Sequence, residues 1–199
     1  MPLISQEDAE QAVRPYADQF VAVVRSAFDD WLNGPYTHQM QRKSLRASVI
    51  SNQMLANARR VFDNVGGIRV DDVPGYTGLL VGDNIFIRMK KADEKLMSRN
   101  YPTKSALAFV DQSKDLFGGL VRLELVYNLG SFGTEIERIA LLQRHKSKVV
   151  WHIDLLDSGT GIQEALPFAQ PPAPEGSAAK SVLKKKRNSG QEEKDVSTG

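Results

Sequence analysis

The spacing of apolar residues changes once along this chain of 199 residues, and that change limits the folds it can adopt. In roughly the first 65 residues, apolar side chains recur every three or four positions, as on one face of an amphipathic helix. After that the period becomes two, which is typical of strands with one buried face. Helices followed by strands predict an α+β fold, with an N-terminal two-helix hairpin packed on a mostly antiparallel sheet of about five strands.

The helical part divides into two segments. The first begins after Ser5, which can form a capping box with Asp8, and it stops at Asn33-Gly34-Pro35. Pro15 either kinks this helix or begins a second one, because proline is tolerated at the first helical position. Another helix is expected from Gln39 to Asn64, where asparagine and glycine end the pattern.

The strand part is read from the period of two. Segments with this period predict strands at residues 77–81, 85–90, 120–128, 135–143 and 149–155. A short helix is expected after Thr103, before the third of these strands. The last three strands are joined by short turns and predict an antiparallel meander. One face of the sheet should carry the two helices, and the other should be partly exposed to water.

The composition changes again near the end of the chain. From about Asp157 the apolar pattern stops, prolines become frequent, and the basic run Lys184-Lys185-Lys186-Arg187 follows. Such a segment buries too little apolar surface to offset its ordering entropy. We therefore expect a single domain at residues 1–160 and a disordered lysine-rich tail at residues 161–199.

Several sequence signals that mark particular classes of protein are absent from this chain. There is no cysteine, so disulfides and thiolate metal sites are absent. The first ten residues lack the apolar run of a signal peptide, and no apolar run approaches a membrane span. A cytoplasmic protein without a membrane partner is expected. The chain also lacks a phosphate-binding glycine loop, a dinucleotide fingerprint and an H-E-x-x-H motif, so we predict no cofactor and no metal, and leave open whether it is an enzyme.

The first candidate binding site is the basic face of the second helix. Arg42, Arg46 and Arg60 share one arc of that helix, where arginines can contact phosphates. Gln53 and Asn57 lie between them and could hydrogen-bond bases or sugars. The alternative is an ordinary solvated helix face.

The second candidate site lies at the end of the strand at residues 85–90. Its members are Arg88, Lys90, Lys91, Arg99 and Asn100. Arg88 and Lys90 share one face of the strand, and the remaining residues follow in a loop, so together they can form an anion site. The alternative is a polar strand end that is balanced by Asp93 and Glu94.

The third candidate is a set of acidic residues and a histidine on the later strands. Its members are Glu124, Glu135, Glu137, His152 and Asp154. Carboxylates with histidine can bind a divalent metal or act as acid and base. Because Glu137 stands beside Arg138, an ordinary cross-strand surface pair is the simpler interpretation.

The middle third of the chain carries a resemblance. It contains, in order, Val73-Pro74-Gly75-Tyr76, then Arg88, Lys90, Lys91 and Asp93, then Ser98, Asn100, Pro102 and Thr103, and finally Gln112. This pattern resembles uncharacterised bacterial and phage proteins whose genes often lie beside a helix-turn-helix or ImmA/IrrE-type metallopeptidase gene. The resemblance implies a two-gene toxin–antitoxin or phage-defence module, and it assigns no role to any residue.

Three functional hypotheses remain open from the sequence. The leading one is a toxin-like or phage-defence protein that is controlled by a cognate protein encoded nearby and acts on nucleic acid, either RNA or DNA, or on its machinery. The second is a non-catalytic module that binds nucleic acid or protein. The third is a metal-dependent hydrolase built on the Glu/His/Asp strand face.

Overall fold

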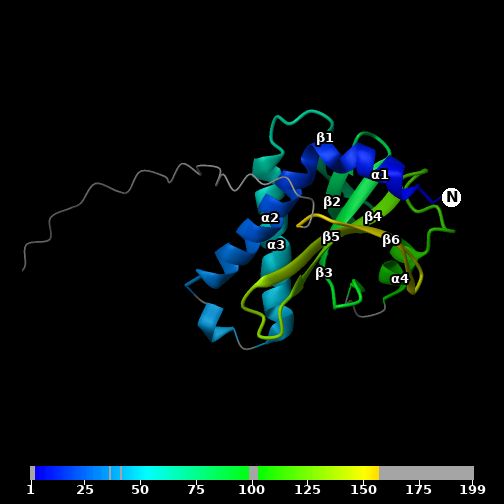
Figure 1. The fold of residues 1–199 in the computed structure, drawn as a ribbon. Coiled ribbons are helices and arrows are strands. Elements are labelled where there is room, and N and C mark those ends of the chain that lie inside the picture. Colours follow the sequence, from blue (N-terminus) through cyan, green and yellow to red (C-terminus); the bar gives the residue numbers. More distant parts are fainter. Residues whose placement is uncertain (1–2, 36, 41, 99–102, 157–199) are drawn as a thin grey trace, which may run out of the picture. The chain divides into compact units, whose positions relative to one another are not determined.

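The computed structural model describes residues 3–35, 37–40, 42–98 and 103–156. It confirms the α+β fold, with N-terminal helices packed on a six-stranded, mostly antiparallel sheet (Figure 1). The predicted tail at residues 161–199 lies outside the described residues, as do the candidate site residues Arg99 and Asn100.

The first helical segment consists of two helices. Helix α1 (Gln6–Val13) begins at Ser5, whose hydroxyl accepts a hydrogen bond from the Asp8 amide at 3.0 Å. A single 3-10 turn that contains Pro15 follows α1 and leads into helix α2 (Ala17–Leu32). Pro15 therefore lies in the turn that joins α1 to α2, and not at the first position of α2 as the second alternative had it.

Helix α3 (Lys43–Val61) completes the predicted hairpin with α2. It begins later than expected because residues 37–39 form a separate 3-10 turn. Helices α2 and α3 contact each other through aromatic rings near the end of α3, where the rings of Phe20 and Phe62 meet edge to face with their centroids 5.8 Å apart. The chain leaves α3 through Asn64, which adopts a left-handed backbone conformation with φ 62°.

The strands follow one another in the sheet in the order of the sequence. They are β1 (Ile68–Val73), β2 (Tyr76–Val81), β3 (Ile85–Lys91), β4 (Val121–Leu129), β5 (Ile136–His145) and β6 (Lys148–Asp154). Neighbours are antiparallel except for β3 and β4, which are parallel and are connected through helix α4 (Lys104–Val110). A parallel pair requires such a crossover connection.

Each face of the sheet is covered by a different part of the chain. The N-terminal helices pack on the face that carries Leu123, Leu125 and Tyr127, as predicted. The opposite face is more closed than expected. Helix α4 brings Phe109 onto Phe86 of β3, with ring centroids 6.3 Å apart, and a second small apolar cluster lies beside it. Several polar side chains on this face, among them Arg88, Arg122 and Glu124, are therefore buried.

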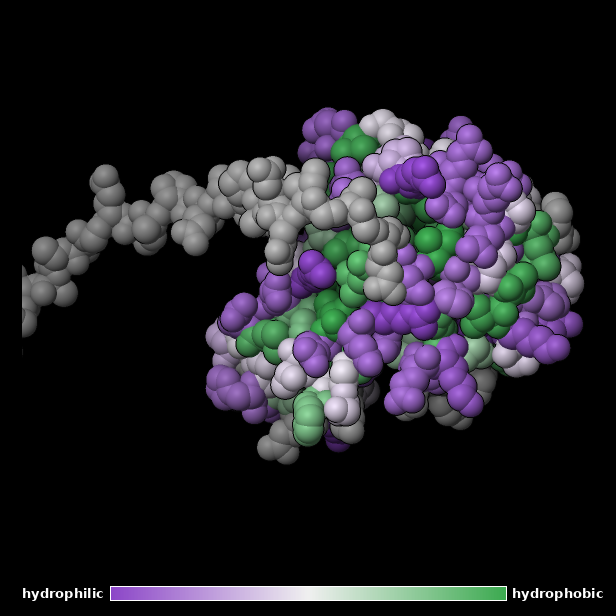
Figure 2. Space-filling view, viewed as in Figure 1, coloured by the Kyte–Doolittle hydropathy of each residue, from purple (hydrophilic) through white to green (hydrophobic). Residues whose placement is uncertain are grey.

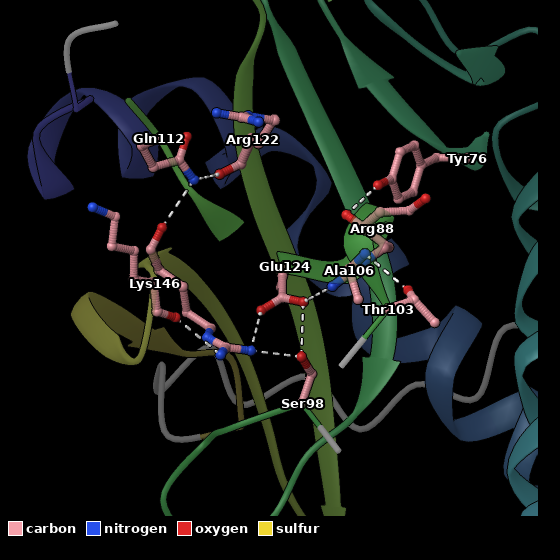
Figure 3. Close-up of polar contacts among 11 residues, drawn as sticks. Tyr76, Arg88, Ser98, Thr103, Ala106, Gln112, Arg122, Glu124 and Lys146 are labelled. Atoms are coloured by element: carbon pink, nitrogen blue, oxygen red, sulfur yellow. Dashed lines mark hydrogen bonds and ion pairs between the residues drawn. The ribbon is translucent and has the colours of Figure 1, made fainter. Parts of the chain in front are cut away.

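A buried arginine fixes the segment that follows α4. Arg122 is 1 % exposed and donates hydrogen bonds to the carbonyl oxygens of Ala108, Asp111 and Lys114, at 3.0, 2.9 and 2.8 Å. The side chain of Gln112 donates to the carbonyl of Arg122 at 3.1 Å (Figure 3). These bonds satisfy carbonyls at the end of α4 and hold that helix against the sheet.

Both hydrophilic and apolar residues reach the surface in the view of Figure 2. Hydrophilic residues cover most of that face, and apolar residues form smaller areas between them. In the described part of the chain, no helix is both long enough and apolar enough to cross a bilayer.

The pairing between β2 and β3 stops early. Strand β1 pairs with β2 along its whole length, but β2 pairs with β3 only from Val81↔Ile85 to Leu79↔Ile87. The next residue of β2 is Gly78, which lies so close to β3 that a Cβ atom would stand 2.4 Å from the carbonyl oxygen of Ile87. Beyond that contact β2 leaves β3, and a gap opens in the sheet.

Candidate anion-binding site

A pocket of about 530 Å³ lies at the gap between β2 and β3. The described residues that line it come from α3 (Ser51 and Leu55), from β2 and the turn before it (Gly75 to Thr77), from β3 (Arg88 to Lys90), and from α4 and its first turn (Thr103, Ser105 and Ala106). The pocket thus joins segments that are far apart in the sequence. Two of the predicted site residues, Arg88 and Lys90, lie in it together.

Arg88 is held rigidly at the base of this pocket. It is 5 % exposed, and its Nη2 atom donates to Glu124 Oε1 at 2.5 Å. Its guanidinium carbon lies 4.1 Å from the centroid of the Phe109 ring, which is cation–π geometry. Neighbouring strands bring the ion pair together, because Arg88 and Glu124 are direct partners in the parallel register of β3 and β4.

The carboxylate of Glu124 is shared with a second arginine. Arg144 Nη1 lies 3.3 Å from Glu124 Oε2 and donates to the hydroxyl of Ser98 at 2.7 Å. That hydroxyl in turn donates to Glu124 Oε1 at 3.0 Å (Figure 3). Glu124 is 1 % exposed, so one buried carboxylate balances two arginines and a surplus positive charge remains.

Lys90 adds a further positive charge at the pocket. Its side chain is half-buried and makes no hydrogen bond or ion pair with any residue that the structure describes. Burial lowers the pKa of the Lys90 ammonium below its ordinary value, and the Arg88 charge lowers it further, against a weaker opposing effect of Glu124. An anion placed in the pocket would relieve both effects.

Neutral polar groups complete the wall next to α4. The hydroxyl of Tyr76 donates to the carbonyl of Ser105 at 2.5 Å, which ties β2 to α4 across the pocket (Figure 3). The hydroxyl of Thr103 caps α4 by accepting a hydrogen bond from the Ala106 amide at 3.1 Å. The wall is therefore built from fixed hydrogen-bonding groups rather than from loose side chains.

The remaining member of this candidate cluster that the structure describes is Lys91. It follows Lys90 on β3 and is half-buried, but its position in the strand directs it to the opposite face. The structure thus brings together Arg88 and Lys90 and separates Lys91 from them.

The basic face of α3 is a different surface. On a helix of 100° per residue, Arg42, Arg46 and Arg60 lie about opposite Ser51 and Leu55, which line the pocket. The two predicted basic clusters therefore do not form one continuous site.

Contacts with other parts of the chain occupy much of that basic face. Arg46 Nη1 donates to the carbonyl of Gly133, in the turn between β4 and β5, at 3.3 Å. Asn57 was expected to be available for bases, but it is 1 % exposed and its amide donates to Ser26 and Asp30 of α2, at 3.2 and 3.1 Å. That expectation is wrong because Asn57 faces the interface between the two helices.

The acidic and histidine residues of the later strands do not assemble as a metal centre. Arg138 donates to Asp154 Oδ2 at 2.6 Å and lies 2.9 Å from His152 Nε2, and its bond holds the pKa of Asp154 below the ordinary value. Glu137 instead accepts a hydrogen bond from Asn128 at 3.2 Å. Within the described ranges, no three histidine, aspartate or glutamate side chains form a group that could hold a metal.

Three contributors to the anion-binding site were not predicted from the sequence. Ser98 and Arg144 share the Glu124 carboxylate, and Phe109 stacks under Arg88. Alternation along β4 places Glu124 on the same face as Arg122, opposite the face that the helices cover. No sequence signal paired it with Arg88, because that pairing depends on the parallel register of β3 and β4.

Comparison of this chain with protein-family models, with curated proteins and with solved structures found no match. What the pocket binds must therefore follow from its own charges and shape.

Proposed function

We propose that this protein binds nucleic acid through phosphate contacts in the pocket between β2 and β3, and that it acts as a toxin-like or phage-defence protein held by a cognate partner. The observation that carries the binding proposal is the surplus of positive charge in a partly closed pocket. Among the residues that the structure describes, Arg88 shares its one carboxylate partner with Arg144, and Lys90 has no ion pair. A phosphate group supplies the missing negative charge.

Some residues of the pattern that carries the resemblance also support this pocket as the binding site. Gly75, Tyr76, Arg88, Lys90 and Thr103 belong to the pattern shared with the two-gene proteins, and all five line the cavity. Residues dispersed over about 30 positions in the sequence thus meet in one place. This convergence favours a ligand common to such proteins, and their association with toxin and defence modules favours nucleic acid as its source.

The binding experiment compares Lys90→Ala with a matched control, Arg25→Ala. Both variants remove one cation, but Arg25 is an exposed residue of α2 that does not line the pocket and belongs to none of the candidate sites. Binding of single-stranded RNA and single-stranded DNA is measured at several salt concentrations. We expect Lys90→Ala to weaken binding and to reduce the salt slope by about 0.7, which corresponds to one lost phosphate contact on a single strand. An unchanged slope, or an equal effect in the control, would refute the pocket as the phosphate site.

The toxin proposal is tested separately by growth. Expression of the wild-type protein alone should inhibit growth of a bacterial host, and Lys90→Ala should relieve the inhibition at equal protein level. Nucleic-acid binding without any growth effect would refute the toxin role and leave a binding module.

A non-catalytic binding module is the second candidate, and the pocket lining favours it. The described lining residues include no aspartate, glutamate, histidine or cysteine, so the wall offers no carboxylate or imidazole as a general base and no ordinary metal ligand. Hydrolysis of RNA by the purified protein, lost on Lys90→Ala, would contradict this candidate.

A further inference from the structure

The backbone of β3 presents hydrogen-bonding groups to the pocket as well as side chains. The amide of Val121 donates to the carbonyl of Asn84, and the amide of Ala92 donates to the carbonyl of Tyr127, both at 2.8 Å. Alternate residues of a strand direct their backbone groups to opposite neighbours. The even-numbered residues of β3 therefore face β4, and the odd-numbered residues face β2.

Strand β2 uses only part of this edge. It pairs with Ile85 and Ile87, and the next residue with the same backbone direction is Met89. Met89 lines the pocket, and no described strand pairs with it on the β2 side. Its amide and carbonyl thus face the gap, and an open strand edge of this kind is a template for another extended chain.

The side chains around the gap define what that chain should look like. Arg88 and Lys90 project from one face of β3, on the side of α4, while Met89 projects from the other face toward α3. Leu55 of α3 also lines the pocket. Because side chains of a strand alternate between faces, a complementary segment carries acidic residues at every second position and apolar residues between them.

We propose that the gap accepts an extended segment of a partner protein, in which acidic and apolar residues alternate, as an added strand on the edge of β3 at Met89. The segment would place carboxylates at Arg88 and Lys90, which are the groups assigned to phosphate. A partner bound in this way excludes nucleic acid from the pocket and so inhibits the protein. This inhibitory consequence rests on the proposed function.

The test uses the full-length wild-type protein, so no variant has to fold. The probe is an eight-residue peptide of alternating glutamate and valine, titrated into isotopically labelled protein. We expect the backbone amide of Met89 to shift and to become protected from hydrogen exchange. One control peptide carries lysine in place of glutamate. Two others are N-methylated on alternate residues, in each of the two phases, which removes donors on one edge and keeps the charge.

The outcomes separate main-chain pairing from attraction of charge. We expect the lysine peptide to fail and one of the two methylated phases to lose binding. If both methylated peptides bind as well as the parent peptide, strand addition is refuted. Protection of Met89 that increases with protein concentration, without any peptide, would assign the edge to a second copy of the chain and overturn the proposal.

The same titration distinguishes failure of the inference from failure of the proposed function. Peptide pairing at Met89 in a protein that binds no RNA refutes nucleic-acid binding and leaves the strand-addition site. If the protein binds RNA but the Met89 amide stays unprotected at the highest peptide concentration, strand addition alone is refuted. When both occur, the peptide should displace bound RNA, and independent binding of the two would refute the inhibitory consequence.

Discussion

Removal of the Glu124 charge should destabilise the fold and strengthen anion binding at the same time. In the wild-type protein both Arg88 and Arg144 lie within 3.3 Å of the Glu124 carboxylate. Glu124→Gln keeps the shape of the side chain but leaves the buried Arg88 and the nearly buried Arg144 without a counter-charge. Breaking a buried ion pair by removal of one partner costs about 3–5 kcal/mol of unfolding free energy. For a domain of this size each kcal/mol corresponds to about 2–4 °C, so the melting temperature should fall by about 6–20 °C.

The assay is thermal and urea unfolding, with and without inorganic polyphosphate. The matched control is Glu94→Gln, because Glu94 is an exposed carboxylate in the segment that follows β3. The control should stay within about 0.5 kcal/mol of the wild type. Polyphosphate should stabilise Glu124→Gln more than the wild type, since the variant pocket has a larger surplus of positive charge. A variant as stable as the control, or one that polyphosphate stabilises less than the wild type, would refute the charge balance described for this network.

Four further predictions concern Lys90, Gly78 and Trp151. Nucleic-acid affinity should fall as pH rises through the lowered pKa of Lys90, below the pH at which an ordinary lysine titrates, and Lys90→Arg should abolish that fall. Over the same window the ligand-free protein should gain stability, because the unfolded chain binds more protons there; pH-dependent urea unfolding measures this. Gly78→Ala places a Cβ atom 2.4 Å from the Ile87 carbonyl oxygen, and should cost about 1–3 kcal/mol in urea unfolding. Trp151→Phe removes a 3.0 Å hydrogen bond to the carbonyl of Ile4, and should cost about 0.5–1.5 kcal/mol and speed hydrogen exchange in α1.

The fold was predictable wherever local periodicity carries the information. The helical hairpin, the strands from β2 to β6 and the cap of α4 at Thr103 all depend on spacing between residues that are close in sequence. Strand β1 was missed because its sequence, Ile-Arg-Val-Asp-Asp-Val, places two consecutive acidic residues in a short run. Aspartate is depleted in strands, so full pairing with β2 overrides local propensity there.

The candidate site was predictable only in part. Alternation along β3 placed Arg88 and Lys90 on one face, and both line the pocket. The same reasoning could not show that Arg88 is buried, since its partner Phe109 comes from α4 and its partner Glu124 from the strand that follows α4. Asn57 shows the opposite error. It shares an arc of α3 with polar residues, which suggested that it is exposed to solvent. The periodicity of α3 does not show where α2 packs against it.

The single parallel junction of the sheet has a consequence for the protein's integrity. Strands β1 to β3 form one continuous meander and β4 to β6 form another, and β3–β4 is the seam between them. The Arg88–Glu124 ion pair spans that seam, with one residue from each meander. A ligand that engages Arg88 while this pair is intact is therefore attached to both halves of the sheet. Its binding energy would oppose their separation, so occupancy of the pocket and cohesion of the two meanders are linked quantities.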